Sequence, residues 1–371
     1  LSKEAQYDGL VGIWYGKGPG VDRCGDVFKH ANAAGSAPHG GVLCVAGDDH
    51  GAKSSTVPHQ SDHAFMSSTM PVLYPSSIHE YMWMGLAGLA MSRYSGCWVG
   101  FKVISETVET TAAVNLKDED VEFIIPTDFD MPEDGLNLRW PDERMQQDSR
   151  LQNHKAYAAL AFARANGFNR VTLASPKARF GIVASGKSYE EARQAIHELG
   201  LTDEQAAQLG VSIYKVGMPW PLEPQGIREF SQGLEEILVV EERREMIENQ
   251  IKQQLFNWAM HERPRIIGKF DEQDQFTLPL DKELDVPMVA KVIAQRLLKL
   301  DLDTDTQIHL SAQIARIDQQ HACSSQILAP VSRTPFYCAG CPHNSSTKVP
   351  KGSRAAAGIG CHFMVQWMDR N

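Results

Sequence analysis

The chain has 371 residues, 43% of them hydrophobic and 22% charged, which is enough apolar material for a globular protein of two or three domains. Its formal net charge of -10 gives no support to nucleic-acid binding, and no apolar run approaches the roughly 18 residues of a membrane helix. No signal peptide is visible, although the chain starts at Leu1 rather than Met, so we expect a cytoplasmic protein with no membrane partner.

The first part of the chain, residues 8–115, alternates predicted strands with a predicted helix. The first two strands end in a glycine-rich turn at 15–20 and an acidic turn at 47–49. Parallel sheets bind ligands at the carboxyl ends of their strands, so these turns are where we expect a site. The predicted strands are 10–14, 42–46 and 97–104, and the predicted helix is 78–92.

Residues 116–150 change character, because Asp, Glu, Pro and Met replace the apolar runs, and they are interpreted as a linker. Residues 179–258 then show the order βαβαβα, which is typical of a small doubly wound domain. The end, 334–371, begins a further unit rich in Cys and Gly. The predicted strands are 180–184, 211–216 and 237–240, and the predicted helices are 151–167, 189–199, 227–233, 246–256, 286–300 and 305–319.

The glycine-rich turn after the first strand contains Gly16, Lys17 and Gly18. Glycines allow a close approach of the backbone to a ligand, and Lys17 and Arg23 could face an anion. The alternative is an ordinary turn from strand to helix with two surface cations.

The densest polar stretch is 47–63, which contains Asp48, Asp49, Ser54 and Ser55 together with three histidines. Polar loops that follow strands often carry function. No spacing typical of a metal site occurs there, and Asp48 could simply cap a helix. Farther along, Arg93 could bind a substrate carboxylate, although a surface ion pair is the alternative.

Three of the seven cysteines, Cys338, Cys341 and Cys361, lie close to the end of the chain. An odd, scattered count does not indicate a disulfide framework. A C-x-x-C pair with a third cysteine suits zinc or an iron–sulfur cluster, and the flanking Gly358 and Gly360 could instead let backbone amides bind phosphate. A metal site needs a fourth ligand, for which histidine or a cysteine elsewhere could serve; chance clustering is a further alternative.

Several of these motifs, in this order, resemble the fused indolepyruvate ferredoxin oxidoreductases of bacteria, a branch of the thiamine-dependent 2-oxoacid:ferredoxin oxidoreductases. The similarity covers essentially the whole chain and is weakest at 116–150 and 260–333. The stretches that carry it are 16–23, 47–49, 53–55, 92–96, 215–217, 220–222, 338–343 and 358–362.

The resemblance implies an α/β fold with a role for each region. The expected regions are a pyrimidine-binding (PYR-like) thiamine domain at 1–115, a linker and helix at 116–169, a transketolase C-terminal-like domain at 170–260, a helical connector at 261–333, and the start of a thiamine diphosphate-binding domain at 334–371. The family pattern places the thiamine-activating glutamate upstream of Leu1 and the Mg²⁺ motif downstream of Asn371. We therefore expect a fragment that is inactive by itself.

The implied reaction is oxidative decarboxylation of an aryl 2-oxoacid, with indolepyruvate preferred, in which coenzyme A takes the acyl group and ferredoxin takes the electrons. The implied cofactors are thiamine diphosphate, Mg²⁺ and a 4Fe-4S cluster, and a homo-oligomer is expected. The alternatives are a thiamine-dependent lyase or transferase without ferredoxin and, more remotely, a zinc-stabilised binding protein. The cluster pattern of the family has Cys-Gly where this chain has Cys341-Pro342.

The predicted site residues follow from these motifs. The catalytic candidates are Arg93, Asp48, Asp49, Ser54 and Ser55, the cofactor-binding candidates are Gly16, Lys17, Gly18, Gly358 and Gly360, and the metal ligands implied by the resemblance are Cys338, Cys341 and Cys361.

Overall fold

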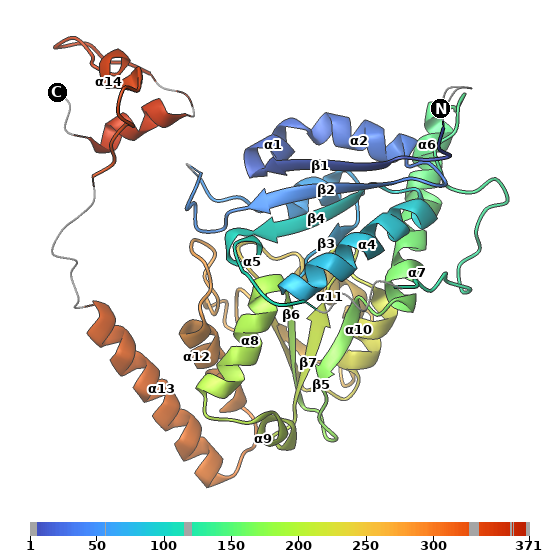
Figure 1. Ribbon diagram of the computed structural model, residues 1–371. Helices are drawn as coiled ribbons and strands as arrows, with labels where there is room; N and C mark the ends of the chain where they lie inside the picture. Colours follow the sequence, from blue (N-terminus) through green and yellow to red (C-terminus); the bar gives the residue numbers. More distant parts are fainter. Residues whose placement is uncertain are drawn as a thin grey trace. The chain divides into compact units, whose positions relative to one another are not determined.

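The computed structural model describes residues 6–55, 57–114, 121–325, 334–356, 358 and 360–368 (Figure 1). The chain divides into two compact units, Leu1–Ile314 and Ala315–Asn371. The first unit contains both α/β domains that the sequence predicts. The domain limits predicted at 115 and 333 fall on segments outside the described residues, and the domain roles stay predictions.

The first domain is built on a four-stranded sheet in which every strand pair is parallel, in the order β1-β2-β4-β3. Helices α1, α2 and α3 cover the face that bears Cys44 and Ala46, and α4 covers the face that bears Leu43. The strands are β1 (Val11–Lys17), β2 (Gly41–Asp48), β3 (Val72–Leu73) and β4 (Val99–Ile104), and the helices are α1 (Gly18–Arg23), α2 (Gly25–Ala34), α3 (Asp62–Ser67), α4 (Ile78–Ser95) and α5 (Ser105–Val108).

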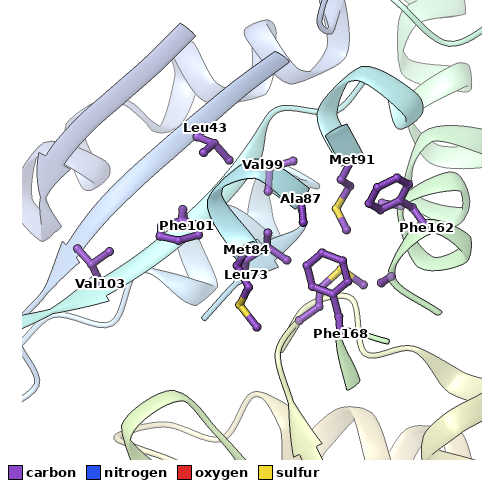
Figure 2. Packing of buried hydrophobic residues seen from close by; sticks show 13 residues of the cluster. Leu43, Leu73, Met84, Ala87, Met91, Val99, Phe101, Val103, Phe162 and Phe168 are labelled. Carbon is purple, nitrogen blue, oxygen red and sulfur yellow. The ribbon is translucent and has the colours of Figure 1, made fainter. Parts of the chain in front are cut away.

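A large apolar cluster of this domain lies where α4 meets the sheet and the helix α7 (Ala156–Ala165) (Figure 2). Met84, Ala87 and Met91 of α4 are fully buried against Leu73 and Val99 of the sheet on one side and Phe162 of α7 on the other. Phe168, just before the second domain, joins the same cluster. The two domains therefore share apolar packing.

The second domain has a five-stranded sheet in the order β5-β7-β6-β8-β9, parallel except for the antiparallel edge strand β5. The predicted βαβαβα order is confirmed. Strand β9 and helix α12, which packs on α8, lie beyond the predicted domain end at 260. The strands are β5 (Asn169–Leu173), β6 (Phe180–Ser185), β7 (Val211–Val216), β8 (Glu236–Val240) and β9 (Arg265–Ile267), and the helices are α8 (Gly186–Glu198), α9 (Asp203–Gln208), α10 (Pro224–Ser231), α11 (Ile247–Leu255) and α12 (Val286–Leu297).

The predicted linker ends in a helix that the sequence interpretation missed. Helix α6 (Arg144–Arg150) starts where the Glu143 carboxylate accepts a hydrogen bond from the Gln146 amide at 2.9 Å. It continues through a π-helical turn, Leu151–Lys155, into α7. A helix start inside a polar, proline-rich stretch has no apolar periodicity to reveal it.

Lys155 in this π-turn is fully buried, and its ammonium donates to the carbonyls of Asn32 at 3.2 Å and Ala33 at 3.0 Å, at the end of α2. Burial lowers the pKa of Lys155 to about 8 from the ordinary 10.5. The unfolded chain therefore binds more protons than the folded chain between these two values, so this residue makes folding more favourable as the pH rises through that window.

Comparison of the wild type with Lys155→Met is expected to show this dependence. The difference in unfolding free energy should shift in favour of the wild type by up to about 3 kcal/mol from pH 8 to pH 10.5. Urea denaturation across this range, with exposed Lys29→Met on α2 as the matched control, measures it. A difference that does not change with pH would contradict the lowered pKa of Lys155.

The second unit contains the end of α13 (Thr304–Ser325), a short helix α14 (His343–Ser346) and a 3-10 helix at Cys361–Trp367. Among the described residues, no helix combines the length and apolar character needed to cross a membrane.

Candidate functional site at the carboxyl edges of the two sheets

The predicted polar loop lies at the carboxyl edge of the first sheet. Strands β1, β2 and β4 end there at Lys17, Asp48 and Ile104, and the loop that follows Asp48 leads to α3 at Asp62. The sequence prediction that the turns after the first two strands share one edge is confirmed by the register, which pairs Lys17 with Gly47.

The Asp48 side chain is fully buried at this edge. Its carboxylate accepts hydrogen bonds from the Ser61 amide, at 3.0 and 2.9 Å, and from the Ser61 hydroxyl at 2.5 Å. Lys102 Nζ lies 3.5 Å from it and 2.7 Å from Asp62. Burial raises the pKa of Asp48, and the positive charge of Lys102 opposes that rise. Asp48 thus fixes the residue that precedes α3, close to the helix-capping role that was the alternative interpretation.

His50 lies beside Asp48 and is also buried. Its Nε2 is 3.9 Å from a carboxylate oxygen of Asp48 and has no hydrogen-bond partner among the residues that the structure describes. Burial, followed by the positive charge of Lys102, lowers the pKa of His50 well below 6.5, so the imidazole is neutral. A neutral imidazole can offer a donor or an acceptor to a ligand.

Asp49 orders the exposed part of the loop. Its carboxylate accepts from the amides of Lys53 at 2.8 Å and Ser54 at 2.6 Å, and from the Ser54 hydroxyl at 3.1 Å. Burial alone would raise the pKa of Asp49, but these amide donors outweigh it and lower the pKa. The Ser55 hydroxyl is buried with no hydrogen-bond partner in the described part of the chain. Asp49 and Ser54 therefore bind each other, and Ser55 is the hydroxyl left for another group.

The turn after β1 joins this loop. Lys17 Nζ donates to the Ser54 carbonyl. A side-chain carbon at Gly18 would lie 2.3 Å from the His59 ring, and one at Gly16 would lie 2.6 Å from the Trp14 ring. These glycines therefore make room for the protein's own side chains, and Lys17 holds the loop through the Ser54 carbonyl.

Arg93 is not brought to this edge. It lies in the last turn of α4, and its Nε donates at 3.0 Å to the carbonyl of Gly40, just before β2 begins. Arg93 thus lies at the amino edge of the sheet, opposite Asp48. The structure separates it from the other catalytic candidates, because α4 runs antiparallel to the strands it covers. Cys97 is fully buried, and burial raises its pKa to about 11, as expected of a core residue.

The carboxyl edge of the second sheet is docked against the first domain. The amides of Val72 and Tyr74 donate to the carbonyls of Trp220 at 2.7 Å and Gly217 at 2.9 Å, which follow β7. The Tyr74 ring lies directly over Gly186, which begins α8 after β6. Ligands of open α/β sheets bind at this kind of position, so the first domain occupies the ligand edge of the second.

Residues 181–188 read GIVASGKS, a spacing typical of phosphate-binding loops. In the structure Gly181 lies inside β6 and Lys187 Nζ binds Glu191 at 2.7 Å and Glu242 at 3.3 Å. A strand at the position of the loop leaves no backbone cradle for phosphate, so this pattern is a coincidence of spacing.

The described residues of the cysteine-rich unit, within 334–368, form a tight turn and no assembled metal site. The Cys341 amide donates to the Cys338 carbonyl at 3.0 Å across Gly340, whose φ is +73°. Cys338 and Cys361 are exposed, Cys341 is half-buried, and Gly360 directly precedes the helix that begins at Cys361. Within the described ranges, no three Cys, His, Asp or Glu side chains converge as metal ligands would. At Gly358 a side-chain carbon would meet open space.

Two buried polar side chains of this region, Tyr74 and Lys102, escaped the sequence interpretation, whereas Asp62 lies within the predicted polar stretch 47–63. Lys102 carried a usable signal, because it is the one charged residue in the apolar run 99–104. A charge inside a buried strand requires a buried partner. Tyr74 carried none, because its contact with Gly186 joins segments more than a hundred residues apart.

The fold of the chain is similar to that of a solved enzyme. A solved 2-oxoglutarate:ferredoxin oxidoreductase from Magnetococcus marinus superposes with a TM-score of 0.51 at 14% identity, covering 79% of this chain and 54% of that chain. This likeness concerns the fold, and the predicted α/β class is confirmed.

Sequence comparisons point to relatives within one family. Residues 169–327 match the model of the indolepyruvate ferredoxin oxidoreductase middle domain. Curated relatives named indolepyruvate oxidoreductase subunit IorA are 25% identical over 350 residues in Pyrococcus abyssi, covering 92% of this chain and 49% of that protein, and 30% identical over 195 residues in Thermococcus kodakarensis, covering 50% and 26%. The chain is related to the indolepyruvate ferredoxin oxidoreductases, as its motifs predicted, and spans about half or less of these relatives.

The described residues do not complete a site for the cofactors that the family implies. The three candidate cysteines are one ligand short of a 4Fe-4S cluster and do not converge, and no cluster of three or more His, Cys, Asp or Glu side chains that could hold a metal ion occurs in the described ranges. For thiamine diphosphate, the carboxyl edge of the first sheet offers only one polar wall, with Ser55 and His50 unpartnered.

Proposed function

We propose that the chain is part of a thiamine diphosphate-dependent enzyme that oxidatively decarboxylates an aryl 2-oxoacid, with indolepyruvate preferred. Coenzyme A takes the acyl group, carbon dioxide leaves, and the electrons pass to ferredoxin. The observation that carries the proposal is the match of residues 169–327 to the middle domain of indolepyruvate ferredoxin oxidoreductases. The curated relatives that span nearly the whole chain support it.

In this proposal the loop at 48–63 forms one wall of the thiamine and substrate site. Asp48 and Asp49 hold the loop in shape, while His50 and Ser55 supply the polar atoms that the described protein leaves unpartnered. Arg93 has no role as a substrate ligand in this proposal, because it lies at the amino edge of the sheet. In this proposal the second domain packs against the first and contributes no ligand-binding residues from the carboxyl edge of its own sheet, because the first domain covers that edge.

The cysteine-rich unit is proposed to complete its metal site only in the assembled enzyme. Cys338, Cys341 and Cys361 would then be three of the four ligands of a 4Fe-4S cluster, and Gly358 and Gly360 would lie beside the diphosphate with its Mg²⁺. The assembly is proposed to be a homo-oligomer. Iron and sulfide analysis of anaerobically purified protein, with Cys338→Ser as the comparison, tests the cluster separately from the reaction.

The reaction is tested with the longest naturally encoded protein that contains this chain, purified without oxygen. We expect viologen reduction that requires thiamine diphosphate and coenzyme A and is fastest with indolepyruvate or phenylpyruvate. Reduction with other oxoacids alone would keep the reaction class and change the substrate. No reduction with any oxoacid, in protein that contains thiamine and iron, would exclude the proposal and favour a thiamine-dependent lyase or transferase without ferredoxin.

A further inference from the structure

A short segment of the second domain, residues 281–285, lies against the candidate-site loop of the first. The Glu283 carboxylate is 3.0 Å from Lys53 Nζ and approaches the backbone of Gly51. Lys53 also binds Glu106 in α5. The cation in the middle of the loop is thus shared between its own domain and this segment.

The same segment is anchored from its other side by buried charges. The Leu284 amide donates to both carboxylate oxygens of Glu242, at 3.2 Å each, and the Leu284 carbonyl accepts from Lys187 Nζ at 2.9 Å. The Leu284 side chain is buried as well. Both backbone polar groups of one residue are therefore fixed by charged partners, which make stronger hydrogen bonds than neutral ones.

This anchor allows the Lys53–Glu283 ion pair to stabilise the position of the loop. The Lys53 side chain is 52% exposed, and an ion pair at that exposure contributes little unless one partner is already held in place. Glu283 directly precedes the clamped Leu284, so its backbone cannot shift without breaking buried hydrogen bonds. On the other side, the amides of Lys53 and Ser54 bind Asp49 and close the loop.

We propose that residues 281–285, clamped at Leu284 by Glu242 and Lys187, form a strap that positions the candidate-site loop 49–55 through the Glu283–Lys53 pair. The proposal rests on the proposed function only in calling this loop part of a site. Lys187 and Glu242 are then positioning residues, because they act on the loop through the backbone of Leu284 and do not touch it themselves.

Hydrogen–deuterium exchange of the chain, followed by mass spectrometry, tests the strap without any turnover. In Glu283→Gln the peptide that covers 49–55 should exchange about tenfold faster, because the closing amides of Lys53 and Ser54 open more often. The matched control is Asp281→Asn, which removes a neighbouring exposed carboxylate of the same segment and should leave this peptide unchanged.

Lys187→Met should accelerate exchange in the same peptide, and Lys187→Arg, which keeps the charge on the clamp, should restore it. Unchanged exchange at 49–55 in Glu283→Gln, or equal acceleration in Asp281→Asn, would overturn the strap. If Lys187→Met fails to fold, Glu283→Gln alone decides, since its pair is partly exposed. Absence of oxoacid oxidation in the longer enzyme would remove the proposed function and leave this result untouched.

Discussion

Gly186→Ala is expected to lower the free energy of unfolding by about 2–5 kcal/mol, which is a large share of the stability of a domain. Two costs add at this position. Gly186 has a φ of +53°, a conformation that disfavours any side chain by about 1–2 kcal/mol. A side-chain carbon would also lie 2.1 Å from the Tyr74 ring, so the two domains would have to separate locally.

The matched control for this substitution is Gly233→Ala in the same domain. Gly233 has a φ of +75°, but a side-chain carbon there would meet nothing within 4 Å, so only the backbone cost applies. Urea denaturation of both variants separates the two contributions. In a Tyr74→Ala background the cost of Gly186→Ala should fall toward that of Gly233→Ala. Equal losses for the two glycines in the wild-type background would show that Tyr74 does not press on α8.

Lys102→Met is expected to destabilise the folded chain by about 3–5 kcal/mol, the usual cost of breaking a buried ion pair. The Lys102 side chain is 4% exposed, as is that of Asp62, and that of Asp48 is fully buried. Removing the cation leaves two buried carboxylates facing each other. Methionine keeps the apolar length of the side chain, so the loss reports the charge and not a cavity.

The pH dependence of this variant has a predictable sign. Burial already raises the pKa of Asp48, and Lys102 is the group that opposes the rise, so Lys102→Met raises that pKa further. A folded pKa above the unfolded one gives stability that is present at low pH and lost as the pH rises through the folded value. The variant should therefore approach wild-type stability in acid and fall behind it toward neutral pH.

Lys53→Met is the control, because Lys53 also lies between two carboxylates but is half-exposed. Its loss of stability should stay below about 1 kcal/mol. Denaturation curves of both variants at several pH values provide the measurement. A Lys102→Met variant no less stable than Lys53→Met would mean that Asp48 and Asp62 are not held by the lysine.

The main strands could be predicted from the sequence because each is an apolar run long enough to stand out. Val211–Val216 lies where the pattern placed it, and β2 and β6 extend the predicted runs by only a few residues. The short strands at the edges of the sheets could not be predicted from the sequence. Strand β3 has two residues and β9 has three, and both exist because a longer neighbouring strand offers them hydrogen bonds.

The candidate site likewise has a part that the sequence predicts and a part that it does not. The loop after β2 was predictable because a parallel sheet presents polar groups where its strands end. The sequence grouped Arg93 with the residues of this loop, whereas the structure places it at the opposite edge of the sheet. Its position depends on the direction in which α4 crosses the sheet, which no local sequence pattern contains. Tyr74 and Lys187 depend on how two domains meet, which is decided by contacts between distant segments.

The backbone hydrogen bonds from Val72 to Trp220 and from Tyr74 to Gly217 also bear on how the chain unfolds. They join the two sheets as neighbouring strands are joined, and the cluster around Phe168 and Met218 adds shared apolar contact. A middle domain excised at residue 169 would lose Phe168 and expose the carbonyls of Trp220 and Gly217 to water. We expect the two α/β domains to melt in a single cooperative transition, so that neither serves as an independent folding unit.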